Sequence, residues 1–250
     1  MLFVQKGQIY GINLNLKQMK LKEKIFNNLK KEKVNFITID GITCSGKSLF
    51  ASLLKKNLKK KFSNVFILSK DLFLFSREKR INTTKKINKI NTNQNKLHYD
   101  LVKLKILLNF LNGTNKNRIL ILNKLYNRKT GKNNLRLKFK HSKNRLIIFE
   151  GIYVNEDIKK IIKPIFKILI IEKIYESLSR KIERIRDKKI SIQLVVSEFI
   201  KIHLESFQIY LSKNSFDNTF KDVNRNFIKI KNGKFEQLSL INKFLSKHRY

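Results

Sequence analysis

The stretch Gly41-Ile-Thr-Cys-Ser-Gly-Lys-Ser48 decides the fold class of this chain. Its two glycines and its final Lys-Ser pair follow the pattern G-x-x-x-x-G-K-[ST], in which a loop between a strand and a helix binds phosphate groups. The flanks have the required character, because VNFITID (34–40) is an apolar β-rich run and residues 47–61 place Leu and Phe side chains on one helical face. We therefore predict a strand, a phosphate-binding loop and a helix in this order.

The residue types in this loop suit a nucleoside triphosphate and its Mg²⁺ ion. Glycines at positions 41 and 46 allow backbone N–H groups to curl around phosphate oxygens, and the helix N-terminus adds partial positive charge. We expect Lys47 to reach the β- and γ-phosphates and the Ser48 hydroxyl to coordinate Mg²⁺. The predicted cofactors are therefore ATP, or another NTP, and Mg²⁺. The residues expected to bind the nucleotide are Gly41, Ile42, Thr43, Cys44, Ser45, Gly46, Lys47, Ser48 and Leu49.

The chain continues as alternating apolar runs and helical patterns. Leucines recur at steps of three and four over residues 97–111, and Gly113 is placed to cap that helix, whereas residues 76–96 indicate a polar connection. Such alternation predicts an α/β fold, a three-layer doubly wound parallel sheet of the P-loop NTPase type. The runs typical of buried parallel strands cover residues 34–40, 64–69, 145–150 and 166–172.

Residues 1–33 precede the first predicted strand and are interpreted as a short N-terminal extension to a P-loop domain over residues 34–250. Apolar residues between Leu16 and Leu29 favour an amphipathic helix in this extension. A basic N-terminal helix is also typical of organellar transit segments, although the Arg and Ser content of such segments is missing. No secretory signal or membrane span is indicated, and Cys44 is the single cysteine. We predict a cytoplasmic protein, with an organelle as the alternative.

The formal net charge of +38 has two interpretations. Clustered Lys and Arg side chains bind nucleic acids through their phosphates, so nonspecific nucleic-acid binding is one of them. The other is compositional drift, because Lys, Asn and Ile are abundant throughout and the lysines are spread from end to end. We favour drift, since net charge governs nonspecific binding and not the fold.

Two carboxylates follow predicted strands. Asp71 comes after NVFILSK, and Glu150 closes RLIIFE. Ligands of an open parallel sheet bind beyond the carboxyl ends of its strands, so both acids are expected to face the cleft that holds the phosphate-binding loop. One carboxylate can accept the proton of an attacking hydroxyl, and another can hold Mg²⁺ directly or through water. We expect Ser48, Glu150 and Asp71 around the metal.

A basic helical stretch follows at residues 177–189. Leu178, Ile182 and Ile185 share one face, which leaves Arg180, Lys181 and Arg184 on the other. Guanidinium groups that close over a phosphate would stabilise its charge during transfer. A solvated helix face is the competing interpretation in so basic a chain.

The ordered segments of this sequence resemble the uridine kinase/phosphoribulokinase-like group of P-loop kinases. The resemblance covers roughly residues 34–210, and it implies a nucleoside-kinase-like fold and transfer of the ATP γ-phosphate to a nucleoside 5′-hydroxyl, as in uridine kinases. The segments that carry it are GITCSGKS, SKDLFLFSREKR, LHYDLVKLKILLNFLNG, LYNRKTGK, RLIIFEGIY and LSRKIERIRD.

The resemblance also implies roles for single residues. Asp71 matches the family's catalytic base, which contacts the acceptor hydroxyl, and Glu150 matches an acid near the metal. Tyr126 matches an aromatic residue near the nucleoside base, and Asp100 falls in an acidic region before a family helix. By the same matching, Arg180, Lys181 and Arg184 belong to a mobile lid over the phosphates; we expect Arg180 and Arg184 to act in catalysis with Lys47, and Lys181 to contact the substrate.

The sequence departs from the family in the segment that binds the sugar hydroxyls. NTNQNKLHYD offers Asp100 as its single acid, with His98 nearby, and the family's Tyr-Asp pair is Tyr126-Asn127 here. We weigh His98 as a substrate contact against an exposed first turn of the 97–111 helix, and slightly favour the latter. The acceptor therefore stays open between a nucleoside and pantothenate, ribulose phosphate, glycerate or nicotinamide riboside. A nucleotide-dependent nucleic-acid-binding protein and a decayed kinase that still binds nucleotide are the alternatives to an enzyme, and oligomeric state is not indicated.

Overall fold

The computed structural model describes residues 16–29, 34–59, 64–85, 97–113, 119–140, 145–185, 190–223 and 226–248. Its centre is a six-stranded sheet with the order β2-β5-β1-β6-β7-β8, in which all neighbours are parallel except β7 and β8. The strands are β1 (Asn35–Asp40), β2 (Val65–Ser69), β5 (Leu146–Glu150), β6 (Phe166–Ile171), β7 (Asn218–Val223) and β8 (Asn226–Ile230).

The central strands are covered on both faces, as their continuous apolar sequences require. Every residue of β1 and of β5 is buried. Residues that alternate along these strands enter two separate apolar cores, so that Ile37 and Ile148 face one core while Phe36 and Phe149 face the other. The four predicted strands are confirmed, and so is the α/β class with a largely parallel sheet.

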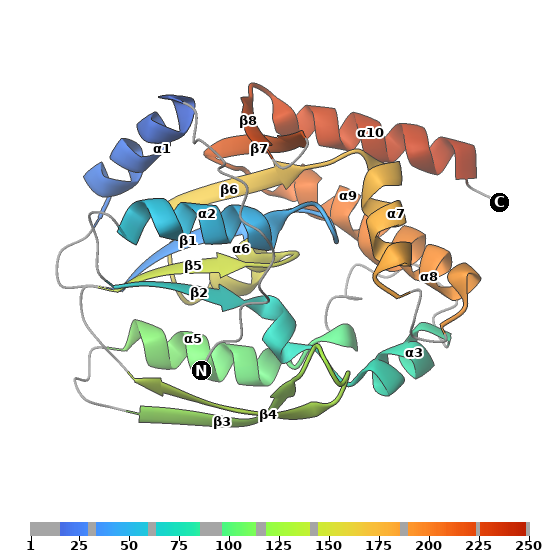
Figure 1. Ribbon diagram of the computed structural model, residues 1–250, viewed down its shortest axis with the longest axis horizontal. Coiled ribbons are helices and arrows are strands. Elements are labelled where there is room, and N and C mark those ends of the chain that lie inside the picture. The colour runs from blue at the N-terminus through green and yellow to red at the C-terminus, as the bar shows by residue number, and fades with distance from the viewer. Residues whose placement is uncertain are drawn as a thin grey trace.

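Helices form the two outer layers (Figure 1). Side chains of α1 (Leu16–Asn27) and α2 (Lys47–Lys59) pack in the core on one face of the sheet. The opposite core is closed by α5 (Leu101–Asn112), α6 (Val154–Ile158), α9 (Ser206–Lys213) and α10 (Gly233–His248). None of the helices within the described ranges is long and apolar enough to cross a membrane.

Helix α1 belongs to the predicted N-terminal extension. Leu21 and Ile25 on this helix are buried in the same core as α2 and the sheet. Their burial removes apolar side chains from water, which stabilises the docked helix. Residues 1–15 and 30–33 lie outside the described residues, so the boundary between extension and domain stays a prediction.

Several further elements gather beyond the carboxyl ends of the parallel strands, on the right of Figure 1. The helices there are α3 (Arg77–Lys85), α7 (Ile174–Glu183), α8 (Ile192–Glu198) and a π-helical segment η3 (Phe199–Glu205), with a short 3₁₀ turn η1 (Lys70–Phe73) after β2. A separate antiparallel hairpin, β3 (Ile119–Tyr126) and β4 (Asn133–Lys140), packs on α5 and η1. These elements surround the end of the sheet where ligands bind in such folds.

Two predicted boundaries were wrong. The helix expected over residues 97–111 begins at Leu101, because Tyr99 forms a β-bridge with Leu74 and Asp100 caps the helix. The connection expected over residues 76–96 contains α3 up to Lys85, and its remainder lies outside the described residues. The 97–111 prediction failed because the leucine spacing continues back to Leu97, whereas the β-bridge of Tyr99 interrupts the helical conformation before Leu101.

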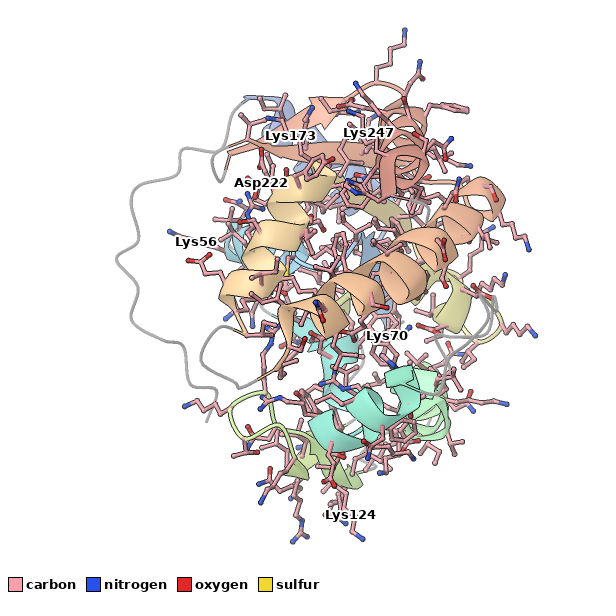
Figure 2. All side chains as sticks on the ribbon, turned by 90° about the vertical axis from the view of Figure 1, so that its right-hand side faces the viewer. Lys56, Lys70, Lys124, Lys173, Asp222 and Lys247 are labelled. Carbon is pink, nitrogen blue, oxygen red and sulfur yellow. The ribbon has the colours of Figure 1, made fainter. Side chains whose placement is uncertain are left out.

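Lysine side chains project from different sides of the molecule. In Figure 2, Lys56 lies at the left, Lys124 at the bottom, and Lys173 and Lys247 near the top, whereas the buried Lys70 lies nearer the centre. This spread agrees with the end-to-end distribution of lysine in the sequence, which we interpret as compositional drift.

Candidate active site

The Gly41–Ser48 loop connects the buried strand β1 to the first turn of α2, as predicted. Cys44 and Gly46 both have positive φ, 61° and 88°, which is the left-handed conformation that curls a phosphate-binding loop. A Cβ atom at position 46 would also lie 3.0 Å from Asp222 Oδ2, so glycine suits this place for two reasons. The backbone N–H of Ser45 donates to the Ile42 carbonyl at 3.3 Å and closes the turn.

Lys47 extends into the space that this loop encloses. Its Nζ donates to the Ile42 carbonyl at 2.5 Å, and the residue is 9% exposed. Burial lowers the pKa of Lys47, an effect that the nearby carboxylates of Glu150 and Asp71 oppose. Lys47 therefore lies inside the loop, and the carboxylates of Glu150 and Asp71 are close to it.

The two strand-end carboxylates are brought to the loop by strand order. Because β5 lies between β2 and β1, the ends of all three strands are adjacent, and Ser69 pairs with Glu150 across β2 and β5. The Ser48 hydroxyl donates to Glu150 Oε2 at 3.2 Å. Burial raises the pKa of Glu150, and the neighbouring Asp71 raises it further. Asp71 itself is half-buried, and Arg128 Nη2 donates to its Oδ2 at 3.3 Å.

Two cavities meet at Asp71. The first, which we call the loop cavity, is lined by the Thr43–Leu49 loop segment together with Asp71, Glu150 and Arg184. The second, which we call the outer cavity, has a volume of about 200 Å³ and shares Asp71, Arg128 and Arg184 with the loop cavity. A carboxylate in the wall common to both spaces can contact groups bound in either of them.

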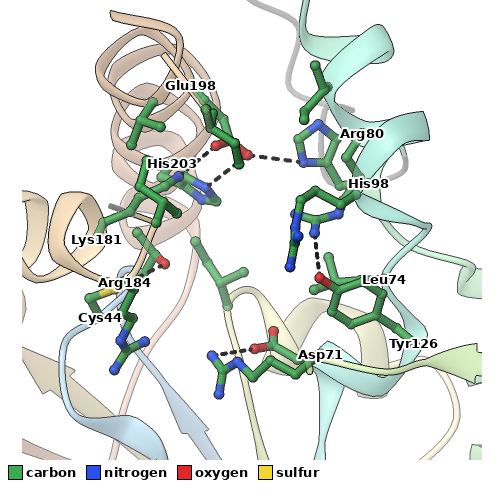
Figure 3. A pocket seen from close by; sticks show the side chains of 18 of the residues that line it. Cys44, Asp71, Leu74, Arg80, His98, Tyr126, Lys181, Arg184, Glu198 and His203 are labelled. Carbon is green, nitrogen blue, oxygen red and sulfur yellow. Dashed lines mark hydrogen bonds and ion pairs between the residues drawn. The ribbon is translucent and has the colours of Figure 1, made fainter. Parts of the chain in front are cut away.

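The outer cavity lies between two walls that come from distant parts of the chain (Figure 3). One wall consists of α3, the β3–β4 hairpin and the residues around His98, and the other consists of α7, α8 and η3. Its charged and aromatic lining includes Arg77, Arg80, Tyr126, Lys181, Glu198 and His203. The described lining therefore combines cationic, aromatic and hydrogen-bonding groups around Asp71.

Tyr126 and Arg80 form one feature of this cavity. The Arg80 guanidinium lies 5.1 Å from the centre of the Tyr126 ring, and its Nη2 donates to the Tyr126 hydroxyl at 3.0 Å. Its Nε donates to the Phe75 carbonyl at 3.1 Å. Tyr126 therefore lines the outer cavity and orients an arginine there, while its predicted place near a nucleoside base stays a prediction.

A cluster of the buried His98 with the partly buried Glu198, His203 and Lys181 lines the outer cavity. Lys181 Nζ is 2.9 Å from Glu198 Oε2, and both histidine rings lie 3.8 Å from Glu198 Oε1. Burial lowers the pKa of each histidine to about 4, so both are neutral near pH 7. Burial alone would raise the pKa of Glu198, but Lys181 and His203 bring it well below its usual range. The expectation of an exposed His98 was wrong, because this ring is 2% exposed and lines the cavity.

Arg180 and Arg184 have different environments although both lie on the basic stretch. Arg180 Nη1 lies 2.6 Å from Glu172 Oε2 and 3.6 Å from Asp222 Oδ2, and it donates to the Cys44 carbonyl at 3.4 Å. It braces the back of the phosphate-binding loop and is absent from the described lining of both cavities. Arg184 lines both cavities. The predicted lid therefore contributes one arginine to the site and one to the support of the loop.

Asp100 lies outside both described linings. Its Oδ1 accepts from the Lys103 backbone N–H at 3.0 Å, and its Oδ2 lies 3.0 Å from Lys103 Nζ. These contacts cap the N-terminus of α5. The geometry therefore explains Asp100 as a helix cap, and no contact in the structure supports the substrate role that the resemblance implied.

Sequence reasoning missed several residues of the outer cavity. Arg77, Arg80 and Arg128 stand in the segments SKDLFLFSREKR and LYNRKTGK that carried the resemblance, but no residue pattern marked them as site residues. Glu198 and His203 lie beyond the basic stretch and had no signal in the sequence. A change from α- to π-helical hydrogen bonding, as in η3, often marks a functional region, but it is visible only in the structure.

Several solved structures with a similar architecture are described as kinases. A protein described as a possible uridine kinase from Bacillus stearothermophilus has a TM-score of 0.55 at 18% identity, over 78% of this chain and 90% of that chain. A protein described as a fructose transport system kinase from Silicibacter has a TM-score of 0.56 at 15% identity, over 80% and 97%. D-glycerate 3-kinase from Cryptococcus neoformans has a TM-score of 0.50 at 10% identity, over 86% and 98%.

The likeness in sequence is much weaker than the likeness in structure. No protein-family model and no curated protein matches the sequence. The structural likeness shows that the chain has the fold of P-loop kinases. The structural comparison therefore supports the resemblance to uridine kinase-like P-loop kinases at the level of the fold.

Proposed function

We propose that this protein is a small-molecule kinase that transfers the γ-phosphoryl group of ATP to a hydroxyl of a small metabolite. The observation that carries the proposal is the position of Asp71, which lines both the loop cavity and the outer cavity. A nucleotide in the first space and an acceptor in the second would meet at this carboxylate. Such a placement is what direct transfer between two bound substrates requires.

In this proposal the Gly41–Ser48 loop and Leu49 bind the triphosphate, and Lys47 contacts its terminal phosphates. The Ser48 hydroxyl and the Glu150 carboxylate, 3.2 Å apart, are oxygen donors of the kind that Mg²⁺ prefers. Within the described residues there is no group of three or more His, Cys, Asp or Glu side chains placed to hold a metal ion. Mg²⁺ commonly takes several ligands from phosphates and water, so Ser48, Glu150 and, through water, Asp71 suffice. When bound, the ion would neutralise charge on the transferred phosphoryl group.

Asp71 acts as the general base. Its carboxylate accepts the proton of the acceptor hydroxyl while that oxygen forms a bond to the γ-phosphorus, and the bond from phosphorus to the β-phosphate oxygen breaks, which releases ADP. Arg128 pairs with Asp71 at 3.3 Å and holds it toward the shared wall of the cavities. Arg184 lines both cavities and is placed to stabilise charge on the phosphoryl group in transfer. Arg180 supports the loop through its hydrogen bond to the Cys44 carbonyl and is not among the described residues that line either cavity.

The acceptor lies in the outer cavity in this proposal. Tyr126 and Lys181 line this space, in agreement with their expected substrate roles, whereas Asp100 does not. A nucleoside remains the first candidate from the resemblance, and pantothenate, ribulose phosphate, glycerate and nicotinamide riboside remain the alternatives. The similar structures are described as acting on different acceptors, so they support a kinase without choosing among these.

The test is a search for a new phosphorylated product. The purified protein is incubated with Mg·ATP and a mixture of nucleosides, vitamins, hydroxy acids and sugar phosphates, and products are identified by mass spectrometry. We expect one acceptor to gain the mass of a phosphoryl group while ADP accumulates in equal amount. A Lys47→Ala variant, treated in the same way, should give no product. Equal product from both proteins would contradict the proposal, and so would ATP binding without transfer to any acceptor.

A further inference from the structure

We propose that the acceptor is an anion, and that Arg77 and Arg80 bind its phosphate or carboxylate group at the end of the outer cavity away from the triphosphate. This inference rests on the proposed kinase function and narrows its substrate class, because it favours the anionic alternatives pantothenate, ribulose phosphate and glycerate over an uncharged nucleoside. It assigns a second anion-binding subsite, distinct from the phosphate-binding loop, to residues that neither the sequence motifs nor the similar structures singled out.

The charge of the outer cavity is the first observation. Its described lining contains five cationic side chains and two carboxylates. Both carboxylates already have cationic partners, because Asp71 lies 3.3 Å from Arg128 and Glu198 lies 2.9 Å from Lys181. A space with this excess of positive charge attracts an anion and disfavours a neutral ligand of the same size. The five cations are Arg77, Arg80, Arg128, Lys181 and Arg184.

The second observation is the kind of cation. The chain has 45 lysines and 11 arginines, so an arbitrary set of five cations should contain about one arginine. Four of the five in this cavity are arginines. Compositional drift toward lysine does not explain this excess. Arginine presents a planar fork of donors that matches the two oxygens of a carboxylate or phosphate, which lysine does not.

Arg77 and Arg80 line a different part of the site from the cavity proposed to bind the nucleotide. Arg128 and Arg184 line both cavities and are close enough to the loop to act on the triphosphate. Arg77 and Arg80 line the outer cavity and are absent from the described lining of the loop cavity. They are three residues apart on α3, so their side chains leave the same face of the helix. An anion that both contact is therefore a part of the acceptor and not of ATP.

Both arginines are held in place by the rest of the fold. Arg80 is oriented by its hydrogen bonds to the Phe75 carbonyl and the Tyr126 hydroxyl. The Arg77 guanidinium lies against Gly131 in the hairpin turn, where a Cβ atom would be 2.8 Å from its Cζ, and its backbone N–H donates to the Gly131 carbonyl at 2.9 Å. Among the described residues, Arg77 has no ion pair with a carboxylate. Pre-oriented guanidinium groups lose little entropy when an anion binds.

The first test measures anion binding without turnover. The loop cavity is filled with a saturating non-hydrolysable ATP analogue and Mg²⁺, and isothermal titration calorimetry then follows inorganic phosphate, acetate and glycerol as probes. We expect phosphate or acetate to bind and glycerol to give no signal, and the stronger of the two anions distinguishes a phosphate from a carboxylate acceptor. Arg77→Gln and Arg80→Gln should each weaken the binding about 10-fold or more. Absence of anion binding to the analogue-filled protein would overturn the inference.

The second test uses the acceptor found by mass spectrometry. Arg80→Gln should raise the acceptor KM about 30- to 300-fold and change the KM for ATP less than about 3-fold, because loss of a charge-assisted contact to substrate acts on binding. Lys79→Gln is the matched control, since it removes one exposed cation from the same helix outside the outer cavity. Arg80→Lys, which keeps the charge without the fork, should give an intermediate value.

The two proposals fail in different ways. Transfer to an uncharged acceptor, or equal effects of Arg80→Gln and Lys79→Gln, would reject the anionic acceptor and leave the kinase intact. Anion binding that depends on Arg77 and Arg80, without transfer to any acceptor, would reject the kinase and leave the subsite.

Discussion

The loop cavity and the outer cavity share Asp71, yet they are assembled in opposite ways. The loop cavity takes most of its lining from seven consecutive residues, Thr43–Leu49, and from residues at or just after the ends of two neighbouring strands. The outer cavity takes its lining from α3, the β3–β4 hairpin, α7, α8 and η3, over more than a hundred residues of sequence. Under the proposed function, phosphate binding therefore depends on a short local segment, whereas acceptor selection depends on how distant elements pack.

The largest expected effect concerns the loop cavity. Lys47→Ala removes the cation that the proposed function assigns to the terminal phosphates, and we expect kcat to fall by about 10³-fold or more. Unfolding in urea should be little changed, because the buried lysine donates to its own loop and belongs to neither apolar core. Lys56→Ala on the exposed face of the same helix is the control and should leave kcat unchanged. A fall in kcat of less than about 10-fold would break the assignment of this cavity to the triphosphate.

Asp71→Asn tests the wall that the two cavities share. We expect turnover to fall about 10²- to 10⁴-fold, because the amide cannot accept the hydroxyl proton. ATP binding, measured by calorimetry, should remain within a few-fold of the original value. Glu183→Gln provides a control for the loss of one carboxylate on the nearby helix α7. Full phosphoryl transfer by purified Asp71→Asn would reject Asp71 as the base.

Arg180 on α7 and Arg184 at the C-cap of this helix sharpen the comparison, because one supports the loop and the other lines the cavities. Arg180→Ala leaves Glu172 and Asp222, at 1% and 3% side-chain exposure, without this cation. Arg180 is itself partly exposed, so we discount the cost of breaking a buried pair and expect a loss of roughly 1–3 kcal/mol in unfolding free energy. Arg184→Ala should leave stability within about 0.5 kcal/mol and lower kcat about 10- to 10²-fold. Urea denaturation and steady-state kinetics on both variants separate these roles, and identical profiles would contradict them.

The last expected effect is on stability alone and concerns the histidines of the outer cavity. Burial holds the pKa of His98 and of His203 at about 4, below the usual value of 6.5, so the unfolded chain takes up protons that the folded chain does not. Stability from these groups is therefore present above pH 6.5 and is lost as the pH falls toward 4, by at most about 3 kcal/mol for each. Asp40 acts in the opposite direction, because burial raises its pKa to about 7.

The difference between His98→Gln and the original protein isolates one histidine. Urea denaturation at pH 7 and pH 5 should show that the original protein loses more unfolding free energy than the variant over this interval. An equal loss in both proteins would show that His98 is not buried as a neutral ring.

The amino-acid sequence alone allowed the sheet and the phosphate site to be predicted. Apolar runs located β1, β2, β5 and β6, because a strand buried on both faces needs apolar residues at every position. The same approach missed the β3–β4 hairpin, β7 and β8, which have mixed or partly exposed patterns. It also extended α5 backward to residue 97, since helical periodicity carries no information about the bridge between Tyr99 and Leu74.

What the sequence by itself determined is the phosphate-binding loop, with Asp71 and Glu150 beside it. These features depend on backbone angles that glycine permits, on a helix N-terminus and on strand ends, all of which short segments specify. Only the tertiary structure decided that Arg180 supports the loop while Arg184 lines the cavities, and that Arg77 and Arg80 line one cavity with Tyr126. Those relations depend on long-range packing, which brings together residues that are far apart along the chain. No local sequence pattern predicts such contacts.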